Sequence, residues 1–216
     1  MRATTRSPSS PSARPMPSSR SCTRGASVPR AGLTPAIVIE RAAALLDAPD
    51  AGPLSFAALA DDLGVRAPSL YKHVDGLAGL ERGVMLRAKT ELGHTLARAT
   101  VGRSRGDAIS AMGHAYRDWA LAHPGQYPLT ITAPVAGDTE DERASASVLE
   151  VVTGVLVGYG LEGDDAIDAI RFLRASLHGF LSLETCHAFE LPVDIERTFA
   201  RTIDTVAASF ETWGRA

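Results

Sequence analysis

Side chains suited to DNA contact gather between residues 66 and 73. The hydroxyl groups of Ser69 and Tyr71 are of the kind that contacts phosphate oxygens, and Lys72 can reach either a phosphate or a base edge. Ala67 is small, so a backbone that enters a groove at this point can approach it closely. These residue types at this spacing indicate nucleic-acid binding, provided that one helix face presents them.

Two short helices with a tight turn between them are predicted to hold this segment. Ser55 is a suitable helix N-cap, and apolar residues then recur at one-turn spacing as far as Leu63. Gly64 follows, where the end of a helix favours a left-handed residue. A second helix is expected from about Ala67 to Val74. Two amphipathic helices joined in this way form a helix-turn-helix, which leaves the outer face of the second helix free for the major groove.

Catalysis is the competing chemistry. Residues 102–106 match the Gly-x-Ser-x-Gly formula of a hydrolase nucleophile, centred on Ser104. Such a serine belongs on a turn from a strand to a helix, whereas the preceding residues 91–100 have a helical pattern. No alternating strand pattern occurs to build the sheet. We therefore expect no catalytic residues and no enzyme activity.

Metal and cofactor chemistry has no clear signal either. Four histidines in the second half lack the i, i+4 or short-loop spacing of a zinc site. These histidines are His114, His123, His178 and His187. Cys22 and Cys186 provide neither a disulfide framework nor a pair of closely spaced metal ligands. We expect no metal and no cofactor.

The elements that must position the DNA-contacting segment are all predicted to be helices. Apolar residues recur with helical period along the chain, and acids or prolines open several of the segments. The expected helices cover residues 35–46, 56–63, 67–74, 77–99, 107–122, a short piece near 126, 139–157, 164–189 and 192–213. The predicted fold class is therefore all-α with about nine helices.

Composition favours a soluble globular protein. Of the 216 residues, 45% are hydrophobic and 22% are charged, which is ordinary for this class. The most apolar stretch, residues 148–161, is interrupted by Glu150 and by three glycines, so no membrane helix is expected. The N-terminus lacks the continuous apolar region of a secretory signal. The cytoplasm is the expected compartment.

The charge is distributed unevenly. Residues 1–30 hold six arginines and no acid, whereas residues 31–90 hold six basic groups and seven acids, a net charge of −1. Ser, Pro and Arg dominate residues 1–30, so we expect a disordered arm. A cationic arm would attract DNA where the folded part does not. The alternatives are an inert tail and a start site wrongly placed upstream of Val28.

Residues 34–92 resemble the DNA-binding region of the tetracycline-repressor (TetR) family. That family has a Gly-Val turn, then Thr or Ser followed by Leu-Tyr, then an aromatic or basic residue and His or Tyr. This chain reads Gly64-Val65, Ser69-Leu70-Tyr71 and Lys72-His73. The resemblance implies DNA contacts by Ser55, Arg66, Ala67, Ser69, Tyr71, Lys72 and His73.

Two departures from the family pattern reduce the expected phosphate contacts. Phe56 and Ala57 follow the Ser55 cap, where the family often has Thr or Arg. Residues 75–78, at the start of the next helix, read Asp-Gly-Leu-Ala, where a lysine commonly contacts phosphate. The folded part is therefore expected to depend on fewer phosphate contacts than its relatives.

The second half resembles a C-terminal ligand domain found in TetR-like regulators, the "WHG" type. The similarity lies in residues 116–127 and in Leu177-His178-Gly179. It implies an apolar pocket between the middle helices and a homodimer built by the last two helices. The pocket candidates are Met112, Tyr116, Trp119, Tyr127, Phe172 and His178. The same residues fit an ordinary core equally well, and Gly179 is expected to allow close helix packing.

These observations predict a three-part chain that regulates transcription. Residues 1–30 would be the arm, 31–76 the DNA-binding domain, and 77–216 the ligand-binding and dimerisation domain. The partners would be a pseudo-palindromic double-stranded DNA operator, an unknown small-molecule effector and a second copy of the chain. The resemblance alone suggests repression. The alternative is a small-molecule-binding or interaction protein whose helix-turn-helix binds DNA weakly or not at all.

Overall fold

A computed structural model describes residues 32–213, which form nine helices and no strand. The helices are α1 (Pro35–Leu46), α2 (Phe56–Leu63), α3 (Ala67–Leu70), α4 (Gly76–Thr100), α5 (Arg105–Ala122), α6 (Tyr127–Thr130), α7 (Thr139–Val157), α8 (Gly163–Thr185) and α9 (Ile195–Trp213). The all-α prediction is confirmed. Within the described range, no helix is both long enough and apolar enough to cross a bilayer. The proposed arm, including Cys22, lies outside the described residues.

Capping residues start and end the first two helices where the sequence indicates. The Thr34 hydroxyl accepts a hydrogen bond from the Ile37 N–H at 3.3 Å, and the Ser55 hydroxyl accepts one from Ala58 N–H at 3.2 Å. Gly64 ends α2 with φ +65°, a left-handed conformation that costs glycine little. Helices α1 and α2 therefore begin on local signals, and α2 also ends on one.

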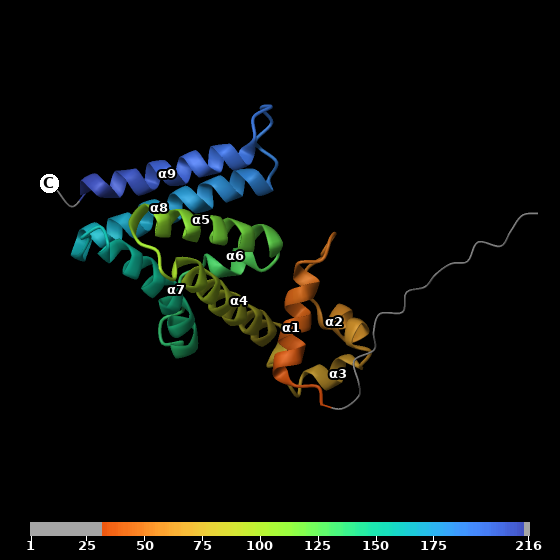
Figure 1. The fold of residues 1–216 in the computed structure, drawn as a ribbon. Coiled ribbons are helices and arrows are strands. Elements are labelled where there is room, and N and C mark those ends of the chain that lie inside the picture. The colour runs from red at the N-terminus through yellow and green to blue at the C-terminus, as the bar shows by residue number, and fades with distance from the viewer. Residues whose placement is uncertain (1–31, 214–216) are drawn as a thin grey trace, which may run out of the picture.

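A small apolar core holds α1, α2 and α3 together, and the first turns of α4 complete it. Leu59 and Leu70 are fully buried in this core, as are Leu80 and Val84 of α4. Further along α4, the buried residues belong instead to the larger core formed with α5 to α9. Helix α4 thus connects the two cores as one continuous element (Figure 1).

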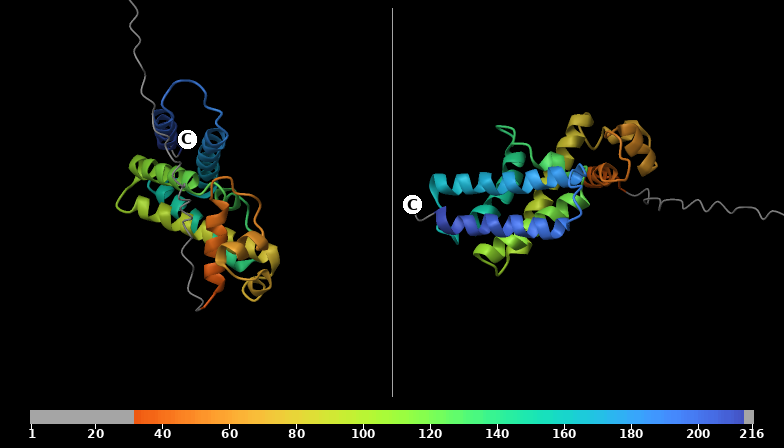
Figure 2. Two further views of the ribbon diagram at one scale, coloured as in Figure 1. Left: turned by 90° about the vertical axis from the view of Figure 1, so that its right-hand side faces the viewer. Right: turned by 90° about the horizontal axis from the view of Figure 1, so that it is seen from above.

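Helices α8 and α9 lie side by side as an outer layer over α5 (Figures 1 and 2). Arg117 links both helices of this layer to α5, because its buried guanidinium pairs with Glu184 of α8 and with Glu196 of α9. The same cation lies 5.0 Å from the centre of the Phe199 ring. One face of the two-helix layer remains uncovered, as the right view of Figure 2 shows.

Three helix boundaries differ from the sequence prediction by three or more residues. Regular α-helix ends at Leu70 rather than Val74, because residues 71–73 form a tighter turn in which His73 N–H bonds to the Leu70 carbonyl. Helix α8 ends at Thr185, since His187 adopts a left-handed φ of 53° and reverses the chain. Helix α9 starts at Ile195, whereas the sequence predicted a start at Pro192.

Candidate functional site

The segment predicted to contact DNA presents one exposed face. Arg66 and Lys72 are exposed, and Tyr71 has 61% of its surface exposed. Leu70 and Val74, on the opposite side, are buried in the small core. The fold therefore places two cations and a phenol on one surface of the helix-turn-helix, as an interface with nucleic acid requires.

The Tyr71 side chain has a support that the sequence does not reveal. Its ring lies 4.7 Å from the ring of Phe56, centre to centre, at an angle of 48°. Phe56 is the residue that departs from the family pattern, and here it packs beneath the exposed phenol. The departure removes a phosphate contact but limits the positions that Tyr71 can adopt.

The other predicted DNA contacts are less exposed or already hydrogen-bonded. The Ser55 hydroxyl caps α2, and the Ser69 hydroxyl donates to the Arg66 carbonyl at 2.6 Å. Both serine oxygens are half-buried at the edge of the face, as are Ala67 and His73. Three of the predicted DNA contacts, Arg66, Tyr71 and Lys72, are thus exposed, and we call them the exposed trio. The other four predicted contacts are partly buried at the edge of the same face.

Ion pairs neutralise several charges of the DNA-binding part. Arg41 of α1 forms a two-pronged pair with Asp62 of α2, at 2.6 and 2.8 Å. Arg82 of α4 pairs with Asp138 and Glu140 at the start of α7, at 2.6 and 2.8 Å. These pairs use two of the six basic groups in residues 31–90, so the exposed trio carries much of the remaining positive charge.

One carboxylate joins the DNA-binding part to the rest of the molecule. Asp47, at the end of α1, accepts hydrogen bonds from the His123 ring at 2.8 Å and from the backbone N–H groups of Gly125 and Gln126 at 3.0 and 3.2 Å. The side chain of Gln126 bonds to it as well. The turn between α5 and α6 is therefore held directly against the end of α1.

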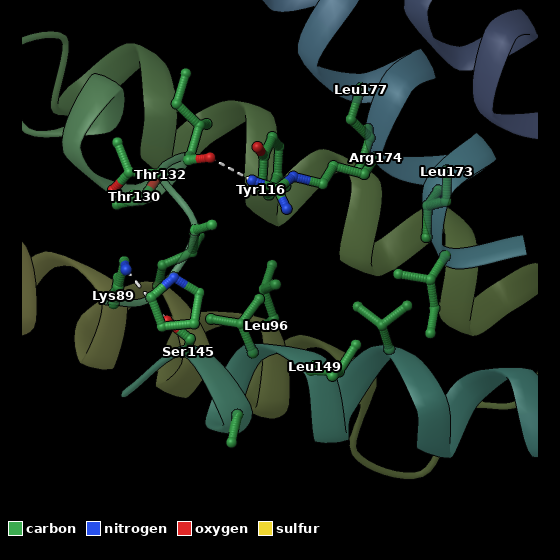
Figure 3. Close-up of a pocket in the computed structure, with 18 of the residues that line it drawn as sticks. Lys89, Leu96, Tyr116, Thr130, Thr132, Ser145, Leu149, Leu173, Arg174 and Leu177 are labelled. Atoms are coloured by element: carbon green, nitrogen blue, oxygen red, sulfur yellow. Dashed lines mark hydrogen bonds between the residues drawn. The ribbon is translucent and has the colours of Figure 1, made fainter. Parts of the chain in front are cut away.

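A cavity of about 390 Å³ opens between α4, α5, α7, α8 and the segment that follows α6. Figure 3 shows its walls, which are largely aliphatic. The apolar lining residues are Leu92, Leu96, Met112, Ile131, Ala133, Pro134, Ala146, Val148, Leu149, Val152, Ile170, Leu173 and Leu177. A cavity of this volume and polarity is typical of a small-molecule site.

Two of the six predicted pocket residues, Met112 and Tyr116, line this cavity. Tyr127 and His178 do not line the cavity but are joined to Tyr116 by hydrogen bonds. The Tyr127 hydroxyl bonds to the Tyr116 hydroxyl at 3.1 Å and to His178 Nδ1 at 2.8 Å. Burial raises the pKa of both phenols, so they stay protonated and act as hydrogen-bond donors. The sequence singled out Tyr116, Tyr127 and His178, but not the hydrogen bonds that join them.

The structure does not bring the remaining two predicted residues to the cavity wall. Trp119 is a buried core residue whose ring lies 4.9 Å from that of His123. Phe172 is 39% exposed and packs against Phe210 and Trp213 of α9. Neither Trp119 nor Phe172 is therefore among the residues that line this cavity.

Two cationic cavity residues were missed by sequence reasoning. Lys89 is 2% exposed and donates to the fully buried Asp141 at 2.6 Å and to Ser145 at 3.1 Å. Arg174 of α8 donates to the Ile131 carbonyl across the cavity (Figure 3). Helical spacing offered a signal for both: Lys89 lies three and seven positions before Leu92 and Leu96 on the inward face of α4, and Arg174 lies at the same spacing before Leu177 and Leu181 of α8.

The buried pair between Lys89 and Asp141 also fixes the cavity wall. Burial opposes ionisation of Asp141, but hydrogen bonds from Lys89 and from the Val135 N–H outweigh it, so the pKa of Asp141 lies below its usual value. The carboxylate therefore joins α4, the start of α7 and the loop before it. The pair keeps this side of the cavity in place.

The competing sites take ordinary structural roles. Ser104 lies in the turn between the helices α4 and α5, so its setting is not that of a nucleophile between strand and helix. No group of three or more His, Cys, Asp or Glu side chains within residues 32–213 is arranged to hold a metal. Cys186 is a free, exposed thiol. A Cβ atom added at Gly179, the residue expected to allow close packing, would meet no neighbouring atom of the described chain within 4 Å.

Comparison with known proteins gives a consistent result. The family model described as "Tetracyclin repressor-like, C-terminal domain" matches residues 109–206. The chain is 35% identical over 205 residues to the HTH-type transcriptional regulator Rv0681 of Mycobacterium tuberculosis, with 94% of this chain and 93% of the relative covered. It is 34% identical over 178 residues to the HTH-type transcriptional regulator YobS of Bacillus subtilis, covering 82% and 92%.

The fold is also similar to that of solved structures. One is a crystal structure of a TetR variant from Acinetobacter baumannii in complex with minocycline. It superimposes with a TM-score of 0.64 and 21% sequence identity, covering 86% of this chain and all of the other. At this identity the likeness concerns the arrangement of helices.

Proposed function

The chain belongs to the tetracycline-repressor family of helix-turn-helix transcriptional regulators, and from this premise we propose that it is a repressor released from DNA by a small molecule. It binds a pseudo-palindromic operator in double-stranded DNA, in the cytoplasm, as a homodimer. The observation that carries the proposal is the position of α4. One end of this helix completes the core under the DNA-contacting face, and the other end lines the cavity.

The exposed trio supports the DNA-binding half of the proposal. Arg66 and Lys72 supply positive charge, and the Tyr71 phenol, supported by Phe56, supplies a hydrogen-bonding group on a rigid ring. The segment is short, so these three residues reach DNA only if the face is placed in the major groove. Ser55 and Ser69 then act at its edge through their hydroxyl oxygens.

The route from cavity to DNA-binding part supports release by a ligand. Residues 130–134, which are the last residue of α6 and the segment after it, line the cavity. The turn before α6 bonds to Asp47 at the end of α1. A ligand that shifts the cavity wall therefore acts on α1 through α6, and on the helix-turn-helix through α4. Only a ligand that binds the DNA-free arrangement more tightly releases the operator.

The uncovered face of α8 and α9 supports the homodimer. Phe172, Ala175, Gly179 and Leu183 are all exposed and recur along one side of α8. Small residues at two of these positions allow a second helix to approach closely. A palindromic operator is matched by a two-fold symmetric pair of subunits, and we assign the contact between the subunits to this face.

The experiment that tests the proposal measures binding of the full chain to DNA from upstream of its own gene, by fluorescence anisotropy at several salt concentrations. The double variant Tyr71→Ala with Lys72→Ala should lose affinity by about 1 to 3 kcal/mol for each contact. Circular dichroism should show unchanged helicity, because both side chains point away from the core. Arg171→Ala, which removes an exposed cation from α8, is the matched control and should bind like the parent chain.

Two results would contradict the proposal. If the double variant binds as well as the parent, the face assigned to DNA is wrong. If the parent chain shows no preference for its upstream DNA over unrelated DNA, the alternative of a small-molecule-binding protein with an inactive helix-turn-helix is favoured.

A further inference from the structure

We propose that the ligand of this cavity is an amphipathic carboxylate, with its anionic group on Arg174 and its apolar body between α4, α7 and α8. The inference rests on the proposed function in so far as the cavity is taken to be the effector site. It specifies the chemistry of the effector.

Arg174 is the cation available to an anion. Its guanidinium reaches across the cavity from α8 and donates to the backbone carbonyl of Ile131, a neutral partner. Among residues 32–213, no carboxylate lies within ion-pair distance of it. An arginine has five N–H donors in a planar fork, and one bond to a carbonyl leaves a pair of them for a carboxylate.

The surroundings of Arg174 suit a charged head group. The residue is exposed at the cavity mouth, so an anion bound there keeps part of its hydration and avoids the large cost of full burial. Its positive charge partly offsets the rise in pKa that burial causes at Tyr116 and Tyr127. The field of Arg174 thus reaches the hydroxyl of Tyr116, which lines the same part of the cavity.

Lys89, the second cation of the cavity, is not the anion site. Its charge is already compensated by Asp141 at 2.6 Å, and both groups are buried. A second anion beside Asp141 would meet a like charge in a medium of low dielectric constant. The ammonium has three N–H groups and two acceptors among the described residues, Asp141 and Ser145. It can therefore donate one hydrogen bond to a neutral ligand atom.

The rest of the cavity excludes a ligand that is polar throughout. Leu96, Leu149 and Leu173 face the space between α4, α7 and α8 (Figure 3). A ligand in contact with these side chains gains from burial of its own apolar surface. Glu142 is the one lining residue that would favour a cation; it is exposed and accepts a hydrogen bond from the Gly137 N–H at 3.0 Å.

The test uses three probes that share one apolar body, octanoate, 1-octanol and octylamine, with calorimetric titration of the DNA-free full chain at neutral pH. Octanoate should bind about tenfold or more tighter than 1-octanol, because hydrogen bonds to a charged group are stronger than neutral ones. Arg174→Gln should remove that preference and leave the affinity for 1-octanol unchanged. Arg174→Lys keeps the charge without the fork, so it should restore the preference in part.

Arg171→Gln is the matched control, since it removes a cation three positions earlier on the outer surface of α8. It should leave all three affinities unchanged. Equal binding of octanoate and 1-octanol, tighter binding of octylamine, or no binding of any probe would overturn the inference. None of these results depends on DNA, so the operator measurement separates failure of the ligand chemistry from failure of the proposed function.

Discussion

At the scale of single residues, charged side chains fix the contacts between distant segments. Arg82 holds the start of α7 against α4, Lys89 holds the loop before α7 through Asp141, and Arg117 holds α8 and α9 against α5. Each cation belongs to α4 or α5, and each carboxylate lies at least 52 positions later in the chain. These pairs select one arrangement of helices whose apolar faces alone would allow several.

The ion pair of Asp138 with Arg82 makes the stability of this arrangement depend on pH. It caps α7 by accepting from the N–H groups of Glu140 and Asp141, and its pair with Arg82 lowers its pKa from 3.8 to about 2. Since the pKa is lowered on folding, the stabilisation is fully present above pH 3.8 and is lost as the pH falls toward 2. Asp138→Asn, which keeps the cap but not the charge, should therefore be less stable than the parent at pH 6.

Urea unfolding at pH 6, 5, 4 and 3 checks this prediction. The difference in the free energy of unfolding between parent and Asp138→Asn should shrink below about pH 4. Asp168→Asn, at an exposed carboxylate within α8, serves as the control. A difference that stays constant down to pH 3 would mean that the ion pair does not contribute to folding.

At the scale of elements, α1 and the turn before α6 approach each other closely at Gly125. A Cβ atom at Gly125 would lie 2.0 Å from the backbone carbonyl oxygen of Leu46. Only glycine permits this approach, and Asp47 then bonds to the backbone of the turn. The end of α1 and the turn therefore move together.

Gly125→Ala should force these elements apart and destabilise the fold by about 1 to 3 kcal/mol, as overpacking does in a tight interior. Differential scanning calorimetry measures the effect. Gly154→Ala is the matched control, because a Cβ there, in the last turn of α7, would meet no atom within 4 Å. It should be neutral or stabilise by up to about 1 kcal/mol. Equal melting temperatures for the two variants would show that the contact at Leu46 yields without cost.

At the scale of the whole molecule, two cores connect the three regions to which we assign functions. The DNA-contacting face belongs to the small core, the cavity opens inside the large one, and the layer of α8 and α9 leaves one face uncovered. The large core is fixed within one chain. The uncovered layer is the part that a second copy would complete.

Leu183→Glu tests this assembly. Leu183 is 50% exposed, so glutamate there should leave the fold of one chain intact. In a symmetric dimer the change would place charge in an apolar contact, and the dissociation constant should rise by about tenfold or more, since an unpaired charge is costly to bury. Sedimentation velocity at several concentrations measures it. Val101→Glu, in the exposed turn between α4 and α5, is the control, and a monomeric parent chain would contradict the model.

The sequence by itself determined the positions of the helices and which residues are exposed on the face that we propose contacts DNA. Thr34, Ser55 and Gly64 act through hydrogen bonds and backbone angles within a few residues, so their effect is readable locally. The periodic apolar residues likewise separate Leu70, which is buried, from Tyr71, which is exposed. The sequence was sufficient to predict the role of a residue wherever that role depends on neighbours within one or two helical turns.

Only the tertiary structure decided which inward residues meet a cavity and which meet other side chains. The helical period marks Trp119 and Met112 alike as buried, yet only Met112 lines the cavity. Arg174 becomes a cavity residue because α8 lies opposite Ile131, 43 positions earlier. Such neighbours depend on how helices far apart in the chain pack against one another, and no local pattern encodes that packing.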